Sequence, residues 1–299
     1  MLSPSTKPSI RASLFRKEVL LFEKRSKNFY PLARALQQRA RHIIKSFLVL
    51  FFKKELLLLL CPLPAQASGV VSLNLCTDQL LVLLAPNQIT ALSPLARDPV
   101  LSVVAPQAQT LPWVRPDAEA VLALHPDLVL AGTYGAQAVV AVLKAHGLRV
   151  VQVAEPNSFD AIATQVTTVS TALNKQPAGA AMIAAMRARL AAIHAGQRGT
   201  AVLWGARGFT AGPGDFGDAV LRQAGYRNIG TGGAMGVEAL AAHPPGTLIT
   251  EAAPAYPSLA TNLLWHPALG GIPRRTVSPP LLACPGPWST AAVEKLAQP

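Results

Sequence analysis

From Val70 onward, short apolar runs alternate with stretches of helical periodicity. The apolar runs predict strands, which read VVSLNL (70–75), ITALS (89–93), DLVLAG (127–132) and RVVQV (149–153). Between them, apolar residues that recur every three or four positions predict helices at 77–84, 118–124 and 137–146. Strands and helices that alternate at this spacing are typical of a parallel sheet covered by helices.

The pattern changes in the middle of the chain and then returns. Residues 158–195 contain no strand pattern and predict two helices separated near Pro177, the second of which is about 30 Å long over 176–195. Further strands follow, which read TAVLW (200–204), TLIT (247–250) and TVS (276–278), with helices at 218–224, at 237–242 and from Ser289. We therefore predict an α/β protein with two mostly parallel lobes, 68–157 and 198–299, joined by one long helix within a helical spacer, 158–197.

A short phrase occurs once in each predicted lobe. EAVLALHP begins at Glu119 and EALAAHPP begins at Glu238, and each leads into an apolar strand. The matched positions indicate that the two lobes are built alike.

A net charge of +12 would suggest a nucleic-acid partner if the basic residues were spread over the folded part of the chain, but they are not. Residues 1–67 hold 13 of the 27 Lys and Arg but 3 of the 15 Asp and Glu, so they carry +10 and the remainder carries 14 minus 12, or +2. The basic charge belongs to the leader, and no nucleic-acid partner is expected. Because 51% of residues are hydrophobic and 14% are charged, the chain is not of the disordered class.

The leader has the order of an export signal. Lys53 and Lys54 precede the apolar run 56–61, and the small residues of Ala65-Gln-Ala67 form a cleavage site. We expect cleavage before Ser68 and a periplasmic protein; an uncleaved anchor and a lipoprotein attached at Cys61 are the alternatives. Residues 1–40 exceed the usual length of a signal's basic region, and an upstream start codon would explain them.

No catalytic motif emerges from the sequence, and we predict neither an enzyme nor a His-based metal site. The stretch from Gly212 to Gly217 satisfies G-x-G-x-x-G, which raises the alternative of a nucleotide-binding oxidoreductase. Seven residues separate this stretch from the preceding strand, whereas the dinucleotide fingerprint begins in the turn at the strand end. A loop that needs glycine for its shape is the favoured interpretation.

Four aromatic residues fall in predicted loops, at or just beyond strand ends or before a helix. These are Trp113, Tyr134, Trp204 and Phe209. Since ligands of open α/β sheets bind outside the carboxyl ends of the strands, the four aromatics predict a flat, partly apolar ligand.

With these features, residues 70–299 resemble the substrate-binding proteins of ABC importers, in the group that binds cobalamin, ferric siderophores and haem. VVSLNLCTDQLLVLL is similar to the family's opening strand and helix. WGARGFTAGPGDFGDAVLRQAGYRNIG resembles the opening of its second lobe, with Phe209 at an aromatic ligand position. The resemblance implies a ligand cleft between two lobes joined by a rigid helix, a captured metal chelate and no cofactor. We expect a monomer that delivers the chelate to the membrane subunits of the transporter.

The resemblance also implies roles for individual residues. Glu119 and Glu238 occupy the places of the two exposed acids that dock onto arginine pockets of the membrane subunits, and Asp98 is kept in the first-lobe segment PLARDP. The acid and arginine of the cobalamin binder's last cleft loop are replaced here by LLACPGPWS. The ligand therefore stays open among a corrinoid, a ferric siderophore and haem, and a receptor for bare metal is a further alternative.

Cys76 and Cys284 are the cysteines that remain after signal cleavage. We expect them in loops of opposite lobes that face the cleft. Three roles stay open: ligands to the metal of the solute, a disulfide, or two separate buried thiols. A disulfide requires the two Cα atoms to lie within about 7 Å of each other.

Overall fold

The computed structural model describes residues 69–252 and 259–299, which fall in one compact unit of the chain. The predicted leader and its cleavage site lie outside the described residues. Among the residues that are described, no helix is both long enough and apolar enough to span a bilayer.

The first lobe is a four-stranded parallel sheet with the strand order β2-β1-β3-β4. Its strands are β1 (Val70–Ser72), β2 (Ile89–Ala91), β3 (Leu128–Gly132) and β4 (Val150–Val153). Its helices are α3 (Leu75–Leu84), α4 (Ala105–Ala108), α5 (Ala118–Ala123) and α6 (Gln137–Ala145), with short 3-10 helices at Pro86–Gln88 and Pro94–Arg97. The predicted strands and helices of this lobe are confirmed, although strand β1 is three residues shorter than its apolar run.

The second lobe repeats the same strand order, β6-β5-β7-β8, again with every pair parallel. Its strands are β5 (Thr200–Leu203), β6 (Arg227–Asn228), β7 (Thr247–Glu251) and β8 (Arg274–Val277). Its α-helices are α9 (Phe216–Gln223), α10 (Val237–Ala242), α11 (Leu259–Asn262), α12 (Pro280–Ala283) and α13 (Thr290–Ala297). Short 3-10 helices lie at Ala206–Gly208, Leu263–Trp265, Pro267–Leu269 and Pro287–Ser289. The two lobes are therefore built alike, as the repeated phrase predicted.

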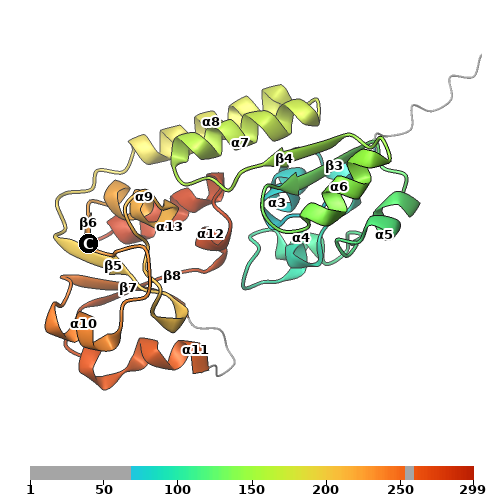
Figure 1. The fold of residues 1–299 in the computed structure, drawn as a ribbon. Coiled ribbons are helices and arrows are strands. Elements are labelled where there is room, and N and C mark those ends of the chain that lie inside the picture. Colours follow the sequence, from blue (N-terminus) through green and yellow to red (C-terminus); the bar gives the residue numbers. More distant parts are fainter. Residues whose placement is uncertain (1–68, 253–258) are drawn as a thin grey trace, which may run out of the picture. The chain divides into compact units, whose positions relative to one another are not determined.

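The spacer consists of two helices, α7 (Phe159–Ala172) and α8 (Gln176–Ala191), which pack side by side as a hairpin (Figure 1). Asn174 adopts a left-handed conformation, with φ of 56°, in the turn between them. Gly179 lets the helices approach closely, because a Cβ there would lie 2.5 Å from the Cβ of Ser170. Helix α8 ends at Ala191 and not at Ala195, so it is about 24 Å long. The long helix expected to join the lobes is therefore α8, and it pairs with α7 in the spacer.

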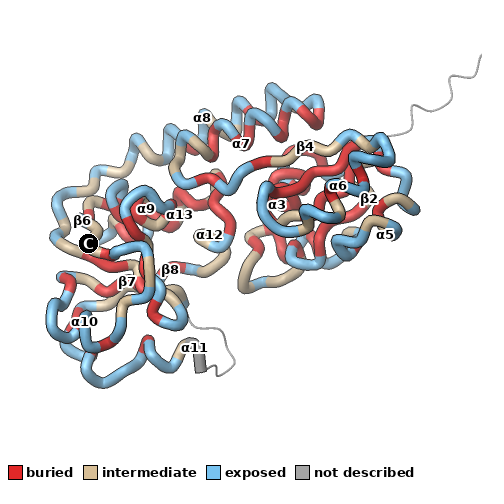
Figure 2. The backbone as a smooth tube through the Cα atoms, viewed as in Figure 1, coloured by how far each residue is buried: buried red, intermediate tan, exposed pale blue. Residues whose placement is uncertain are grey.

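Helix α3 lies between the sheet of the first lobe and the spacer. Every one of its residues except Leu83 is buried, whereas α8 buries only Gly179 and Met186 (Figure 2). Helix α3 packs against strands β1 and β3 and against helix α7, so both sheet and spacer cover it. Its surroundings hold the candidate functional site.

Candidate functional site

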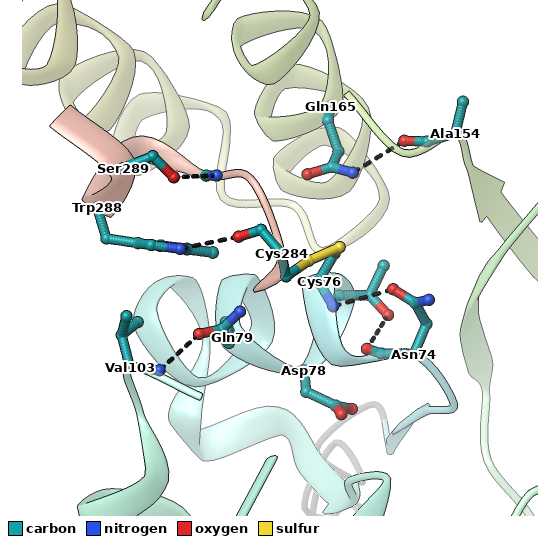
Figure 3. The surroundings of a disulfide bond; sticks show 12 residues. Asn74, Cys76, Asp78, Gln79, Val103, Ala154, Gln165, Cys284, Trp288 and Ser289 are labelled. Atoms are coloured by element: carbon teal, nitrogen blue, oxygen red, sulfur yellow. Dashed lines mark hydrogen bonds between the residues drawn. A yellow bond between two sulfur atoms is a disulfide. The ribbon is translucent and has the colours of Figure 1, made fainter. Parts of the chain in front are cut away.

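The carboxyl edges of the two sheets are joined by a disulfide between Cys76 and Cys284 (Figure 3). Cys76 lies in the first turn of α3, directly after strand β1, and Cys284 ends helix α12, which follows strand β8. The two Cα atoms are 5.4 Å apart across 208 residues of sequence. The bond therefore links the segments that follow the carboxyl ends of β1 and β8, and open α/β sheets bind ligands at such edges.

This pairing corrects the expectation that the two cysteines are separate buried thiols or ligands to a metal. A metal ligand has to be a thiolate, and neither sulfur is one while it is bonded to the other. Both cysteines are buried, at 8% and 0% exposure, in a small apolar cluster with Leu75 and Leu101. Cys76 is also in a helix and not in a loop, because the Asn74 side chain caps α3 by accepting from the Cys76 backbone N–H at 2.9 Å.

A pocket of about 40 Å³ opens at the carboxyl ends of β1, β3 and β4. Its lining residues are Asn74, Cys76, Gly132, Thr133, Tyr134, Val153, Ala154, Glu155 and Gln165. Tyr134 is 78% exposed, so its ring is available to a solute at this edge. Gln165 donates from Nε2 to the carbonyl of Ala154 at 3.0 Å, while its Oε1 is buried with no partner among the described residues. Polar groups therefore line part of the pocket, and the sequence pattern did not single out Gln165.

Trp113 lies beside the end of strand β2 and is 44% exposed. Leu92, one residue past that strand, donates to the Pro112 carbonyl at 3.0 Å and accepts from Val114 at 2.8 Å, which fixes the backbone on both sides of Trp113. The Arg97 guanidinium lies 5.8 Å from the ring centroid of Trp113, a cation–π contact that the sequence analysis missed. Trp113 is thus held in place while part of its ring remains exposed to solvent.

Asp98 ends the 3-10 helix at Pro94–Arg97 in this same segment. Its Oδ1 accepts from the Val100 backbone N–H at 2.8 Å, so the carboxylate stabilises its own turn. The local structure gives Asp98 a turn-forming role, and its contact with a solute stays a prediction.

Trp204 does not face a ligand, and this part of the prediction is wrong. Its side chain is 0% exposed, and its Nε1 donates to the Met235 carbonyl at 2.9 Å within the core of the second lobe. The loop after β5 folds back over the indole, because the Gly205 N–H donates to the Phe209 carbonyl at 2.7 Å. The same fold leaves Phe209 59% exposed just beyond the carboxyl end of β5. Phe209 is therefore the aromatic that this loop presents.

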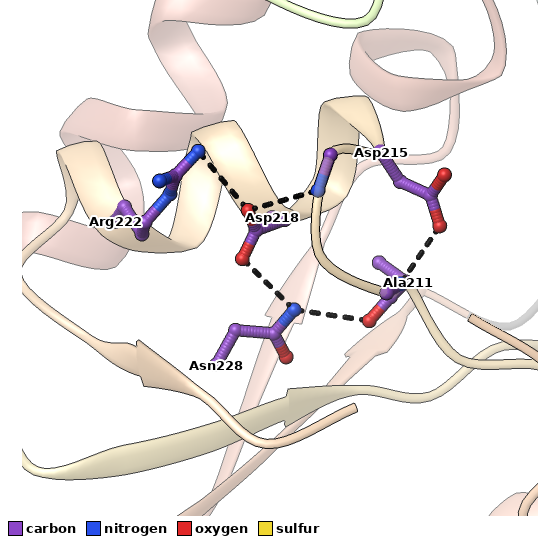
Figure 4. Close-up of polar contacts among 7 residues, drawn as sticks. Ala211, Asp215, Asp218, Arg222 and Asn228 are labelled. Carbon is purple, nitrogen blue, oxygen red and sulfur yellow. Dashed lines mark hydrogen bonds and ion pairs between the residues drawn. The ribbon is translucent and has the colours of Figure 1, made fainter. Parts of the chain in front are cut away.

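The glycine-rich loop is closed by its own acids (Figure 4). The Gly212 N–H donates to the Asp215 carboxylate at 2.7 Å, and the Gly214 N–H donates to the Asp218 carboxylate at 3.3 Å. A Cβ on Gly212 would lie 2.5 Å from the Gly232 Cα, so this glycine serves a close backbone approach. A pyrophosphate would meet two carboxylates where it needs free N–H groups. The geometry favours the structural interpretation over a dinucleotide site.

Asp78 is a buried carboxylate that ties α3 to the segment after β2. It accepts from the Ser93 backbone N–H at 3.1 Å and from the Ser93 hydroxyl. Burial raises the pKa of Asp78 to about 7, although the hydrogen bonds of Ser72 and Ser93 oppose this shift. Burial also raises the pKa of Glu251, at the carboxyl end of β7. In the described parts of the chain, no group of three or more His, Cys, Asp or Glu side chains gathers as a metal site would require.

Glu119 and Glu238 occupy equivalent positions in the two lobes. Each is the second residue of its helix, α5 or α10, and each is exposed. Helix α5 precedes β3 and α10 precedes β7, and these two strands hold the same place in the two strand orders. The topology therefore makes the two acids a matched pair on opposite lobes.

Comparisons with known proteins agree with this architecture. A model of the periplasmic binding protein family matches residues 70–264. The fold is similar to that of a periplasmic haem-binding protein from Pseudomonas aeruginosa, with 23% identity over 77% of this chain and 91% of that chain and a TM-score of 0.61. It is also similar to that of the periplasmic haem-binding protein HutB of Vibrio cholerae, with 15% identity over 77% of this chain and 98% of that chain and a TM-score of 0.65.

A third similar structure comes from an ABC-type Fe3+-hydroxamate transport system of Saccharomonospora viridis, with 18% identity over 77% of this chain and 91% of that chain and a TM-score of 0.57. At these identities the structures establish the fold alone. No curated protein matches the chain at a significant level. The family model, however, spans more than half of the 299 residues. The chain therefore belongs to the periplasmic binding protein family.

Proposed function

We propose that the protein captures a metal chelate between the carboxyl edges of its two sheets and delivers it to the membrane subunits of an importer. The observation that carries this proposal is the disulfide, because it brings both carboxyl edges together at one place. Each edge carries exposed aromatic residues, Trp113 and Tyr134 in the first lobe and Phe209 in the second. Aromatic faces of this kind suit a wide, partly apolar solute.

The chelate class is supported by two of the similar structures, whose proteins are described as haem-binding and as part of an Fe3+-hydroxamate transport system. Both solutes enclose their metal in an organic ligand, so a receptor for them needs shape and aromatic contacts and no cluster of metal-ligating side chains. The exposed rings at the two edges meet this need.

Replacing an exposed aromatic should weaken solute binding. We expect Trp113→Ala, Tyr134→Ala and Phe209→Ala each to raise the dissociation constant for haem or a ferric trihydroxamate by about tenfold, which corresponds to about 1.4 kcal/mol. Titration followed by visible absorption measures the constants.

Trp265→Ala is the matched control, because Trp265 is 60% exposed but stacks on Arg274, which begins strand β8 and so lies at the amino edge of the sheet. This variant should bind with unchanged affinity. If the variants at Trp113, Tyr134 and Phe209 bind both chelates as tightly as the unmodified protein does, these rings do not contact the solute and the site lies elsewhere.

The location in the periplasm requires export, and we propose that the leader is cleaved before Ser68. The small residues at Ala65 and Ala67 support this site. We also expect the mature receptor to be a monomer. The intact mass of the exported protein and its elution volume check both statements, and a retained leader or a dimer would contradict them.

A further inference from the structure

A helical hairpin and a disulfide both join the lobes. The first is the helical hairpin: α7 packs on α3 of the first lobe, and α8 packs on α13 of the second. Arg189 holds this second contact by a bidentate pair with Glu294, in which both N–O distances are 2.7 Å. The second connection is the Cys76–Cys284 bond at the carboxyl edges. The bond adds a covalent link between the lobes beside the place where α7 and α8 also pack on the 3-10 helix at Pro287–Ser289.

The bond is anchored in rigid structure on its first-lobe side. Cys76 lies in the capped first turn of α3, a helix whose residues are buried except for Leu83. Movement of Cys76 away from the second lobe would therefore have to carry the whole packed helix with it.

The second-lobe side is equally fixed. The Cys284 carbonyl accepts from Trp288 Nε1 at 3.0 Å. The Gly286 N–H donates to Ser289 Oγ at 3.1 Å, and that hydroxyl donates to the Leu281 carbonyl at 2.7 Å. Gly286 is required here, because a Cβ would lie 2.2 Å from the Trp288 ring. The disulfide thus joins two ordered turns (Figure 3).

We propose that the Cys76–Cys284 disulfide is an interlobe staple that holds the carboxyl edges of the two sheets at one separation. The two lobes then do not swing apart about the hairpin. Solute enters and leaves through the open side of the cleft between them. One consequence rests on the proposed delivery to an importer. Glu119 and Glu238, which we expect to dock onto the membrane subunits, lie on different lobes, so the staple also fixes the distance between them.

The staple is tested on the solute-free protein, so the result does not depend on which chelate binds. Fluorophores are attached through non-canonical amino acids at Ala141 on α6 and Ala241 on α10, both exposed. Single-molecule energy transfer then compares the unmodified protein with the Cys76→Ser/Cys284→Ser variant. We expect one narrow distance distribution with the disulfide and a distribution at least twice as broad without it. Equal widths would overturn the proposal.

A second variant separates the bond from the packing of the sulfur atoms. Cys76→Ala/Cys284→Ala keeps an apolar group beside Leu75 and Leu101 and should broaden the distribution as the serine variant does. In the unmodified protein, thiol titration after unfolding without reductant should find Cys76 and Cys284 unreactive. Two reactive thiols from this pair would overturn the staple whatever the variants do.

Discussion

Reversing the charges of Glu119 and Glu238 together is expected to abolish solute uptake and to leave solute binding unchanged. Each acid is exposed at the second position of a short helix, and the two helices hold equivalent places in the two lobes. Against an arginine pocket, Glu→Arg creates a like-charge contact that can cost several kcal/mol, which corresponds to a hundredfold or greater loss of affinity for the membrane subunits. Transport into vesicles that contain the importer measures the loss.

Asp160→Arg is the matched control for this reversal. Asp160 is likewise the second residue of its helix, α7, and it is exposed, but it lies on the spacer between the lobes. It therefore shares any favourable interaction with the helix dipole but not the proposed docking role. Each single Glu reversal should impair uptake less than the double one, and Asp160→Arg should not impair it. If the double Glu variant supports normal uptake, the two acids serve only at the start of their helices and do not dock onto the membrane subunits.

Asp78→Asn is expected to remove a large pH dependence of folding stability. Burial raises the pKa of Asp78 to about 7 from its ordinary value of 3.8, so the folded state retains a proton that the unfolded state releases. This contribution to stability is complete below about pH 4 and is lost as the pH rises through about 7. The free energy of unfolding of the unmodified protein should therefore fall, relative to that of the variant, by about 3 kcal/mol between pH 4 and pH 7.

The asparagine side chain resembles the protonated acid in shape and still accepts a hydrogen bond from the Ser93 N–H. Urea unfolding of both proteins across this pH range measures the difference, and Asp160→Asn serves as the control because Asp160 is exposed. The raised pKa of Glu251 acts in both proteins and cancels in the comparison. A difference between Asp78→Asn and the unmodified protein that is constant with pH would show that Asp78 ionises normally.

The fold was predictable because its signals are local. Apolar runs marked seven of the eight strands in the described residues, and the missed strand, β6 (Arg227–Asn228), is two residues long and carries no apolar side chain. The repeated phrase also anticipated the equivalence of the two lobes, because each copy precedes the same strand of its sheet.

The site was less predictable because burial and pairing depend on distant parts of the chain. Trp204 ends an apolar run, and nothing local indicates that the following loop folds over its ring. Cys76 and Cys284 are separated by 208 residues, and whether they pair depends on how two lobes meet. Arg97 and Gln165 act through backbone carbonyls of distant residues, which no sequence spacing reveals.

The central claim is that the protein is a receptor for a metal chelate, and the protein taken from the periplasm with its solute tests this claim most directly. Cells that export the protein are grown with haem and a ferric trihydroxamate, and the periplasmic protein is purified without unfolding. Its native mass and visible spectrum are then recorded. We predict a mature chain that carries one chelate, with visible absorption that is lost on unfolding in urea. A colourless protein whose native mass equals that of the chain alone, or of the chain with a nucleotide, would contradict the account.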